Sequence, residues 1–294
     1  MQPLTRRIVI ALAALLLSAC SGEVPAPQAQ AASESGPPPA RAPRPLGAPP
    51  NVILIVVDTL RADHLSHYGY ARDTAGPIDD LRAESTIFSN AYSTAPWTGP
   101  STMSIHTGLS TLRHGANRHG DALSEEAVTL AEHLSQAGYS THGISFNHNV
   151  SEETGFDQGF DTFDDFLGKA TQYPDIERMT RKVDRWLATA PPEPYFLYLQ
   201  PMNVHGPYRV PRSSRSKLLG RAPSDAFQYY GQPMAPIMRQ SELERREDVT
   251  PEIMESLVDQ YDVAIHYSME QIALMLEAIR EQGLLDETVV ILTS

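Results

Sequence analysis

Apolar runs alternate along this chain with amphipathic stretches, a pattern that predicts strands and helices in turn. Asn51 to Val57 is a continuous β-branched and apolar run. Such a run is typical of a strand that is covered on both faces of a parallel sheet. Further strands are predicted over residues 140–146, 194–199 and 288–292.

Helices are predicted between these strands. One begins near Ser124 or Thr129, where Thr129 and Glu132 have capping-box spacing, and it ends at Gly138. Another begins at Thr250-Pro251, and its apolar positions step by three and four as far as Gly283. Shorter helices are expected over residues 77–83 and 175–190. The alternation predicts an α/β fold, a three-layer αβα sandwich with a mostly parallel central sheet, whose ligands bind beyond the carboxyl ends of the strands.

The first 50 residues do not follow this pattern. Arg6 and Arg7 precede a ten-residue apolar run, which is too short to span a bilayer and fits a secretory signal. Leu17-Ser18-Ala19-Cys20 resembles a bacterial lipobox, so residues 1–19 are interpreted as a lipoprotein signal peptide and Cys20 as the lipidated residue. A plain signal peptide with an incidental cysteine is the alternative.

Residues 20–50 are rich in Ala and Pro and are expected to form a disordered tether, which leaves residues 51–294 as the domain. Ser21 after the cysteine implies, under the sorting rule of such lipoproteins, the outer membrane. The expectation is therefore an exported bacterial protein, anchored through the lipid on Cys20 and facing the periplasm or the cell surface.

Composition narrows the possible functions. The formal net charge of −13 argues against nucleic acid as a partner, because phosphate binding needs clustered basic residues. The single cysteine excludes an intramolecular disulfide and a Cys-rich metal site. A site for an anionic substrate must then be built locally, from a metal ion, a helix dipole or a few cations.

Three positions combine chemistry with a place at the carboxyl end of a strand or the start of a helix. Asp58 directly follows the first apolar run, where its carboxylate is suited to a hard divalent cation, or to a simple turn or helix cap. Pro100 suits the first turn of a helix and places Thr98 at its positive end, as a nucleophile or merely as a cap. His205 follows the strand at 194–199 and is a candidate to bind or protonate substrate oxygen.

Five blocks in order resemble the sulfatase family of the alkaline phosphatase superfamily. They are the strand ending in Asp58, the Thr98-Gly-Pro-Ser block followed by Arg113-His114-Gly115, the Gly155-Phe-Asp and Gly159-Phe-Asp pair, Asn203-Val-His205-Gly-Pro, and Leu284 to Thr293. The resemblance implies an ester hydrolase or transferase with one divalent metal ion (Mn, Mg, Ca or Zn), held by Asp58 and Thr98. It implies catalytic roles for Thr98 and His205, and substrate binding by His148 and His119.

Departures from the family pattern shape the expected chemistry. Sulfatases carry Cys or Ser, converted to formylglycine, at the position of Thr98, whereas threonine at this position is found in phosphodiesterases and phosphoglycerol transferases of the superfamily. Thr59 stands where many sulfatases have a second metal-binding Asp. The family also continues, after the strand that ends at Ser294, with an Asp-His or Asp-Asn pair, so the chain is expected to be incomplete at its C-terminus.

These observations give one leading hypothesis and two alternatives. The leading one is a membrane-tethered, metal-dependent enzyme that acts on phosphate or sulfate esters through Thr98. The first alternative is a sulfuric ester hydrolase. The second is a catalytically inactive lipoprotein that keeps the sulfatase fold as a binding module.

Overall fold

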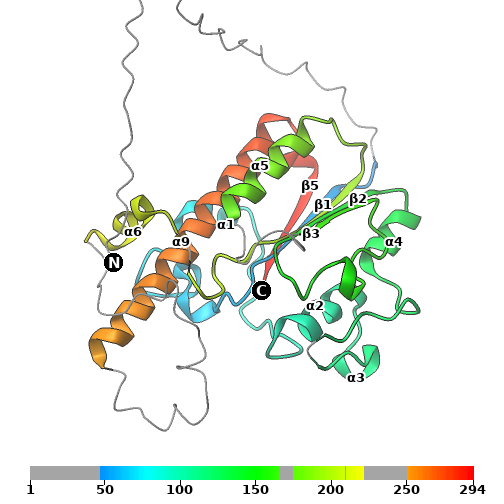
Figure 1. The fold of residues 1–294 in the computed structure, drawn as a ribbon. Helices are drawn as coiled ribbons and strands as arrows, with labels where there is room; N and C mark the ends of the chain where they lie inside the picture. The colour runs from blue at the N-terminus through cyan, green and yellow to red at the C-terminus, as the bar shows by residue number, and fades with distance from the viewer. Residues whose placement is uncertain (1–46, 119, 166–174, 209, 222–249) are drawn as a thin grey trace, which may run out of the picture. The chain divides into compact units, whose positions relative to one another are not determined.

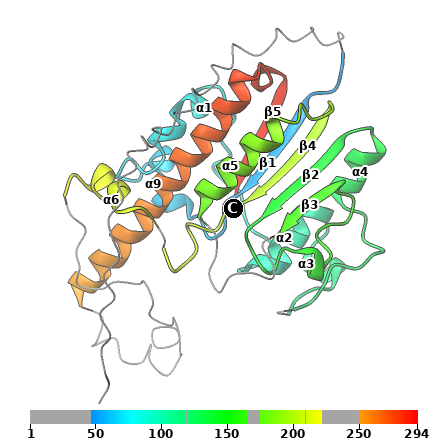
Figure 2. The same ribbon diagram turned by 45° about the horizontal axis from the view of Figure 1, so that its top comes forward.

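A computed structural model describes residues 47–118, 120–165, 175–208, 210–221 and 250–294. Within this part of the chain lie five strands, drawn as arrows in Figures 1 and 2: β1 (Asn51–Val56), β2 (Ser140–Ser145), β3 (Thr162–Asp165), β4 (Tyr195–Gln200) and β5 (Thr288–Thr293). The strands form one sheet in the order β3-β2-β4-β1-β5, and every neighbouring pair is parallel. All five strands therefore end at the same edge of the sheet.

Helices connect the strands and cover both faces of the sheet. The α-helices of the described residues are α1 (Asp79–Ala83), α2 (Thr98–Thr107), α3 (Thr111–His114), α4 (Leu130–Gln136), α5 (Ile176–Leu187), α6 (Arg212–Leu219) and α9 (Pro251–Glu281). Short 3-10 turns lie at Ala62–His64, Ser66–Tyr68, Gly76–Ile78, Glu152–Thr154 and Leu285–Glu287. No helix in the part of the chain described is long and apolar enough to cross a membrane.

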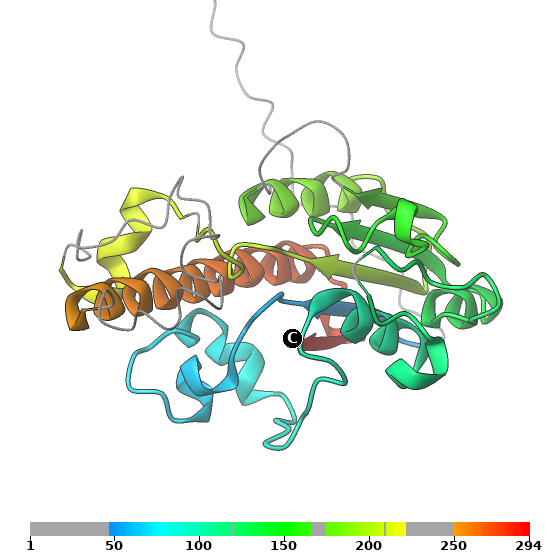
Figure 3. The ribbon, with the colours of Figure 1, turned by 60° about the horizontal axis from the view of Figure 1, so that its bottom comes forward.

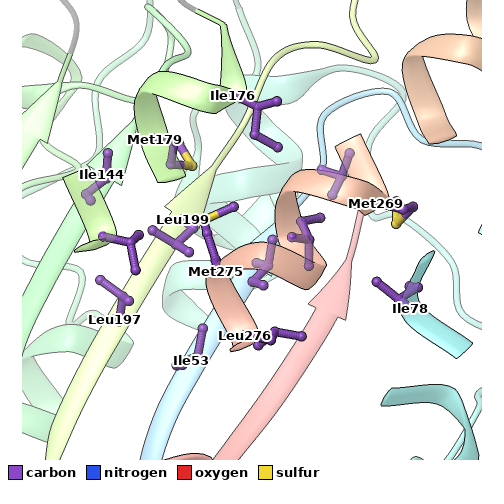
Figure 4. Close-up of a cluster of buried hydrophobic side chains, with 14 of the residues drawn as sticks. Ile53, Ile78, Ile144, Ile176, Met179, Leu197, Leu199, Met269, Met275 and Leu276 are labelled. Atoms are coloured by element: carbon purple, nitrogen blue, oxygen red, sulfur yellow. The ribbon is translucent and has the colours of Figure 1, made fainter. Parts of the chain in front are cut away.

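The apolar core has two halves, one on each face of the sheet. Alternate residues of β1 and β4 face opposite sides, as the pleat of a strand requires. Ile53, Leu197 and Leu199 pack against α5 and α9, and Figure 4 shows Met179 and Met275 meeting them there. On the other face, a second set of side chains packs between the sheet and helices α2 and α4: Leu54, Val56, Met103, Ala131, Phe196 and Tyr198. This confirms the predicted three-layer αβα architecture.

Local signals account for the ends of several elements. The Thr129 hydroxyl accepts from the Glu132 amide at 3.1 Å, and the Glu132 carboxylate accepts from the Thr129 amide at 2.7 Å, so the predicted capping box is formed. The Thr250 hydroxyl caps α9 by accepting from the Ile253 amide at 3.4 Å, with Pro251 in the first turn. Three elements were not predicted, β3, α3 and α6. Each is short, and β3 and α6 carry many polar residues, so they lack a strong periodic signal.

Candidate functional site at the carboxyl edge of the sheet

Asp58 emerges from β1 at the carboxyl edge of the sheet, between the ends of two neighbouring strands. The backbone amide of Asp58 donates to the carbonyl of Pro201, just after β4, at 3.4 Å. The amide of Val57 donates to the carbonyl of Thr293 on β5 at 2.9 Å. These bonds set the direction in which the chain leaves the sheet, and the Asp58 side chain is left only 6% exposed.

Thr98 is the first residue of α2, and its hydroxyl faces this carboxylate. The Thr98 Oγ1 atom donates toward Asp58 Oδ2 at 3.1 Å and lies 3.3 Å from Oδ1. The N-cap residue is Trp97, which has extended backbone (φ −154°, ψ 160°) and makes no side-chain capping bond. Thr98 is therefore not a simple cap. Its hydroxyl sits at the positive end of the helix dipole, where an anionic group is favoured. All three ribbon views place α2 beside the end of β5 (Figures 1, 2 and 3).

Two side-chain amides also donate to Asp58. Asn147, two residues beyond β2, donates from Nδ2 to Asp58 Oδ2 at 2.5 Å, and Gln200, the last residue of β4, donates from Nε2 to the same oxygen at 3.4 Å. Asn147 is 3% exposed and Gln200 is fully buried. Oδ2 thus receives three neutral donors, whereas Oδ1 has only the Thr98 hydroxyl within reach among the described residues.

This donor set fits part of the coordination shell of a divalent cation. Buried carboxylates are usually paired with a cation, yet no Lys, Arg or His of the described residues contacts Asp58. The carboxylate and the Thr98 hydroxyl are hard oxygen ligands of the kind that Mg²⁺, Ca²⁺ and Mn²⁺ prefer. No group of three or more His, Cys, Asp or Glu side chains suited to a metal occurs among the residues described. Asp58 and Thr98 would thus be two ligands of a larger set.

Thr59 adds no second carboxylate to the candidate site, and its contacts stabilise the loop after β1. Its hydroxyl lies 2.9 Å from the carbonyl of Val204 and donates toward it, and its own carbonyl accepts from the Tyr261 hydroxyl of α9 at 2.7 Å. Thr59 has φ 59°, a left-handed conformation that is rare and strained for a β-branched residue. Contacts from α9 and from the loop after β4 hold this strained turn directly beside Asp58.

His205 lies on the loop after β4, at the same edge of the sheet. Its backbone amide donates to the Met202 carbonyl at 3.0 Å, and the neighbouring Val204 carbonyl receives the Thr59 hydroxyl. The ring atom Nδ1 lies 2.7 Å from the Gly206 carbonyl oxygen. Since a carbonyl can only accept, Nδ1 carries a proton. Of the two ring nitrogens, Nε2 is then the one suited to meet a substrate oxygen.

The remaining predicted site residues, which were assigned to substrate binding and to lipidation, are not found at Asp58 in the described part of the chain. His148 is exposed, and its neighbour Asn147 is the residue that reaches Asp58. His119 and Cys20 lie outside the described residues, as do the predicted signal peptide and most of the tether. The roles assigned to these residues therefore stay predictions.

Gln200 is a site residue that the sequence reasoning missed, and Asn147 is one whose contact with Asp58 it did not predict. A signal for both was present. Each is a polar residue at or just past the end of an apolar strand, which is the same position that singled out Asp58 and His205. The strand order was the missing information, because β2, β4 and β1 lie side by side although they are far apart in the sequence.

Sequence relatives include sulfatases. An arylsulfatase of Clostridium perfringens is 36% identical over 104 residues, which is 35% of this chain and 22% of that protein. An N-acetylglucosamine-6-O-sulfatase of Bacteroides thetaiotaomicron is 31% identical over 108 residues, 37% of this chain and 19% of that protein. The chain thus aligns with about a fifth of the length of each of these two relatives.

A solved structure shares the fold. The phosphonate monoester hydrolase of Agrobacterium radiobacter has a TM-score of 0.64 at 18% sequence identity, covering 83% of this chain and 62% of that one. The family model described as Sulfatase matches residues 50–294, which include the whole sheet and the candidate site. The chain therefore belongs to the sulfatase family.

Proposed function

We propose that this protein cleaves or transfers phosphate esters, or cleaves sulfate esters, with Thr98 as the nucleophile. The observation that carries the proposal is the contact of the Thr98 hydroxyl with the buried Asp58 carboxylate, at 3.1 Å and at the first residue of α2. The hydroxyl, a proton acceptor and the positive end of a helix dipole meet at one point. This is the combination that activates a hydroxyl toward an anionic ester.

We further propose that one divalent cation (Mn²⁺, Mg²⁺, Ca²⁺ or Zn²⁺) binds with Asp58 and Thr98 among its ligands. Support comes from the buried, hard-oxygen donors and from the absence of a cationic side chain beside Asp58 among the described residues. When bound, such an ion neutralises charge on the ester and favours the ionised hydroxyl. A solved structure with the same fold, the C-terminal periplasmic domain of EcEptC from Escherichia coli, is a Zn complex (TM-score 0.58, 18% identity, 83% of this chain and 63% of that one).

The reaction we propose has two transfers. In the first, Thr98 Oγ1 bonds to phosphorus, its proton passes toward Asp58, and the bond from phosphorus to the leaving oxygen breaks. His205, when its imidazole is protonated, donates a proton from Nε2 to that leaving oxygen. In the second, the oxygen of water or of an acceptor alcohol bonds to phosphorus and gives its proton to Nε2 of His205, which lost one in the first transfer. The bond from phosphorus to Thr98 Oγ1 breaks, and Oγ1 takes its proton back from Asp58. Hydrolysis and transfer differ only in this acceptor.

Phosphate esters are the favoured substrates because the nucleophile is threonine. A threonine lacks the second hydroxyl of an aldehyde hydrate, so it has no internal route to expel sulfate from a covalent intermediate. Sulfate-ester hydrolysis remains the second candidate, supported by relatives that are sulfatases.

The decisive experiment compares a phosphodiester, a phosphonate ester and an aryl sulfate as substrates of the full chain, with Mn²⁺ and with EDTA. Thr98→Val keeps the shape and removes the hydroxyl, so it should abolish turnover. Thr107→Val, at the far end of the same helix, is the matched control and should keep it. Retained turnover in Thr98→Val would exclude Thr98 as nucleophile, and a preference for the sulfate would favour the second candidate. If folded, metal-loaded protein turns over none of these esters, the result would favour the remaining alternative, a catalytically inactive binding module.

A further inference from the structure

A chain of buried hydrogen bonds runs along β4 to the candidate site. The Tyr198 hydroxyl donates to Gln200 Oε1, and Gln200 Nε2 donates to Asp58 Oδ2 at 3.4 Å. Tyr198 and Gln200 are two residues apart on one strand, so both side chains point to the same face of the sheet, where α2 lies. Both are fully buried, which keeps water from substituting for either partner.

The direction of this chain is fixed by the chemistry of its members. Burial raises the pKa of the Tyr198 phenol well above its usual value, and the charge of Asp58 raises it further, so the phenol keeps its proton. A phenol that donates to Oε1 leaves the NH₂ group of Gln200 facing the carboxylate. The opposite amide orientation would place Oε1 against the negative Asp58 and leave the phenol proton without an acceptor.

The surroundings prevent Tyr198 from turning away. The ring of His106, on α2, meets the Tyr198 ring edge-on with centroids 4.5 Å apart. The ring centroid of Phe160, which lies just before β3 in the chain, is 6.2 Å from that of Tyr198. Asn147 is oriented in a comparable way, because its Oδ1 accepts from the Asn149 amide at 2.8 Å and its Nδ2 is left for Asp58. Both amides on Oδ2 are thus oriented by a further donor.

We propose that Tyr198 and Gln200 are positioning residues for Asp58. Their hydrogen bonds, with that of Asn147, occupy Oδ2 and fix the plane of the carboxylate, so that Oδ1 is the oxygen that faces a bound ligand beside Thr98. Because the donor groups are neutral, they fix the carboxylate and leave its charge in place. A lysine or arginine would cancel that charge. The hydrogen-bond chain itself does not depend on the proposed function. Its expected consequence, the binding of a cation beside Thr98, rests on the proposed function.

Two measurements on the full chain test this proposal. The first is ¹⁵N NMR of the Gln200 side-chain amide, assigned as the signal that disappears in Gln200→Met. The second is Mn²⁺ affinity, followed by electron paramagnetic resonance of the free ion. Tyr198→Phe removes one hydroxyl of the chain. Tyr195→Phe is the matched control, since Tyr195 is equally buried at the other end of β4 and its hydroxyl lies 3.4 Å from Thr288 Oγ1.

We expect Tyr198→Phe to shift the Gln200 amide signal and to speed the exchange of its protons with solvent. We also expect it to weaken Mn²⁺ binding about tenfold, which is the lower end of the effect seen when a residue that orients a metal ligand is replaced. Tyr195→Phe should change neither. The proposal is overturned if Tyr198→Phe behaves like Tyr195→Phe, or if the amide signal moves while the Mn²⁺ affinity does not. Failure of the unmodified chain to bind Mn²⁺ would count against the metal site of the proposed function. In that case Asp58→Asn decides the inference, because the Gln200 signal must move when its acceptor loses its charge.

Discussion

His106 offers a sharp test of how burial governs the pH dependence of stability. This residue lies on α2, is 2% exposed and has its Nε2 buried without a hydrogen-bond partner among the described residues. The rings of Phe156 and Tyr198 meet it edge-on at 5.2 and 4.5 Å. Burial lowers the pKa of the imidazole from 6.5 to about 4. The folded protein therefore keeps His106 neutral over the range in which the unfolded chain protonates it.

The sign and size of the effect follow from this difference. Well above pH 6.5 both states are neutral at His106 and the residue adds no pH dependence. As the pH falls toward 4, the unfolded chain binds a proton that the folded protein does not, so the free energy of unfolding decreases. At about 1.4 kcal/mol per pKa unit, the loss is about 2 kcal/mol at pH 5 and about 3 kcal/mol once the pH is below both pKa values.

Replacing His106 by phenylalanine removes this proton site while keeping an aromatic ring in the pocket. We expect urea unfolding of His106→Phe to lose about 2 kcal/mol less than the unmodified chain between about pH 7.5 and about pH 5. His133→Gln, which removes an exposed histidine from α4, is the control and should keep the original dependence. Equal pH dependence in His106→Phe and the unmodified chain would refute the reasoning.

Three further predictions concern other parts of the chain. Asp262→Ala should lower the free energy of unfolding by about 2–3 kcal/mol in urea titrations, because it removes a fully buried carboxylate on which Arg72, His64 and Tyr70 converge, each at 2.6 Å. Gly159→Ala should lower the melting temperature in calorimetry, since φ is +83° and a Cβ there would lie 2.3 Å from the Glu132 amide nitrogen; an unchanged transition would contradict the geometry. Cys20→Ala should abolish incorporation of labelled palmitate in a bacterial host, whereas labelling that persists would refute lipidation at this residue.

The predictable part of the fold is the part encoded locally. The β1 run, the Thr129 capping box and the Thr250-Pro251 start of α9 each depend on residues that are neighbours in sequence, and each was placed within a residue or two. The edge strand β3 was missed because its sequence, Thr162 to Asp165, has half its positions exposed and only one apolar residue. Its strand geometry comes from parallel pairing with β2, a tertiary contact that no local pattern reports.

The residues of the candidate site also fall into a locally predictable group and a group that depends on tertiary structure. The rule that ligands bind at the carboxyl ends of parallel strands singled out Asp58 and His205, and the Pro100 signal placed Thr98 at a helix start. The rule does not say which strands are neighbours. Asn147 and Gln200 reach Asp58 only because β4 lies between β2 and β1, so their contacts required the sheet order.

Two buried carboxylates of this protein are held in opposite ways, and the contrast bears on function. Asp262 is fully buried, and Arg72, His64 and Tyr70 each approach it at 2.6 Å, so it has a cationic partner and joins the loop after β1 to α9. Asp58 is almost as buried, yet its donors are two amides and one hydroxyl. A carboxylate kept from water without a positive partner is costly to the folded state. Placed at a helix N-terminus and at the open edge of the sheet, that unbalanced charge is the structural reason to expect a cation at Asp58 and not at Asp262.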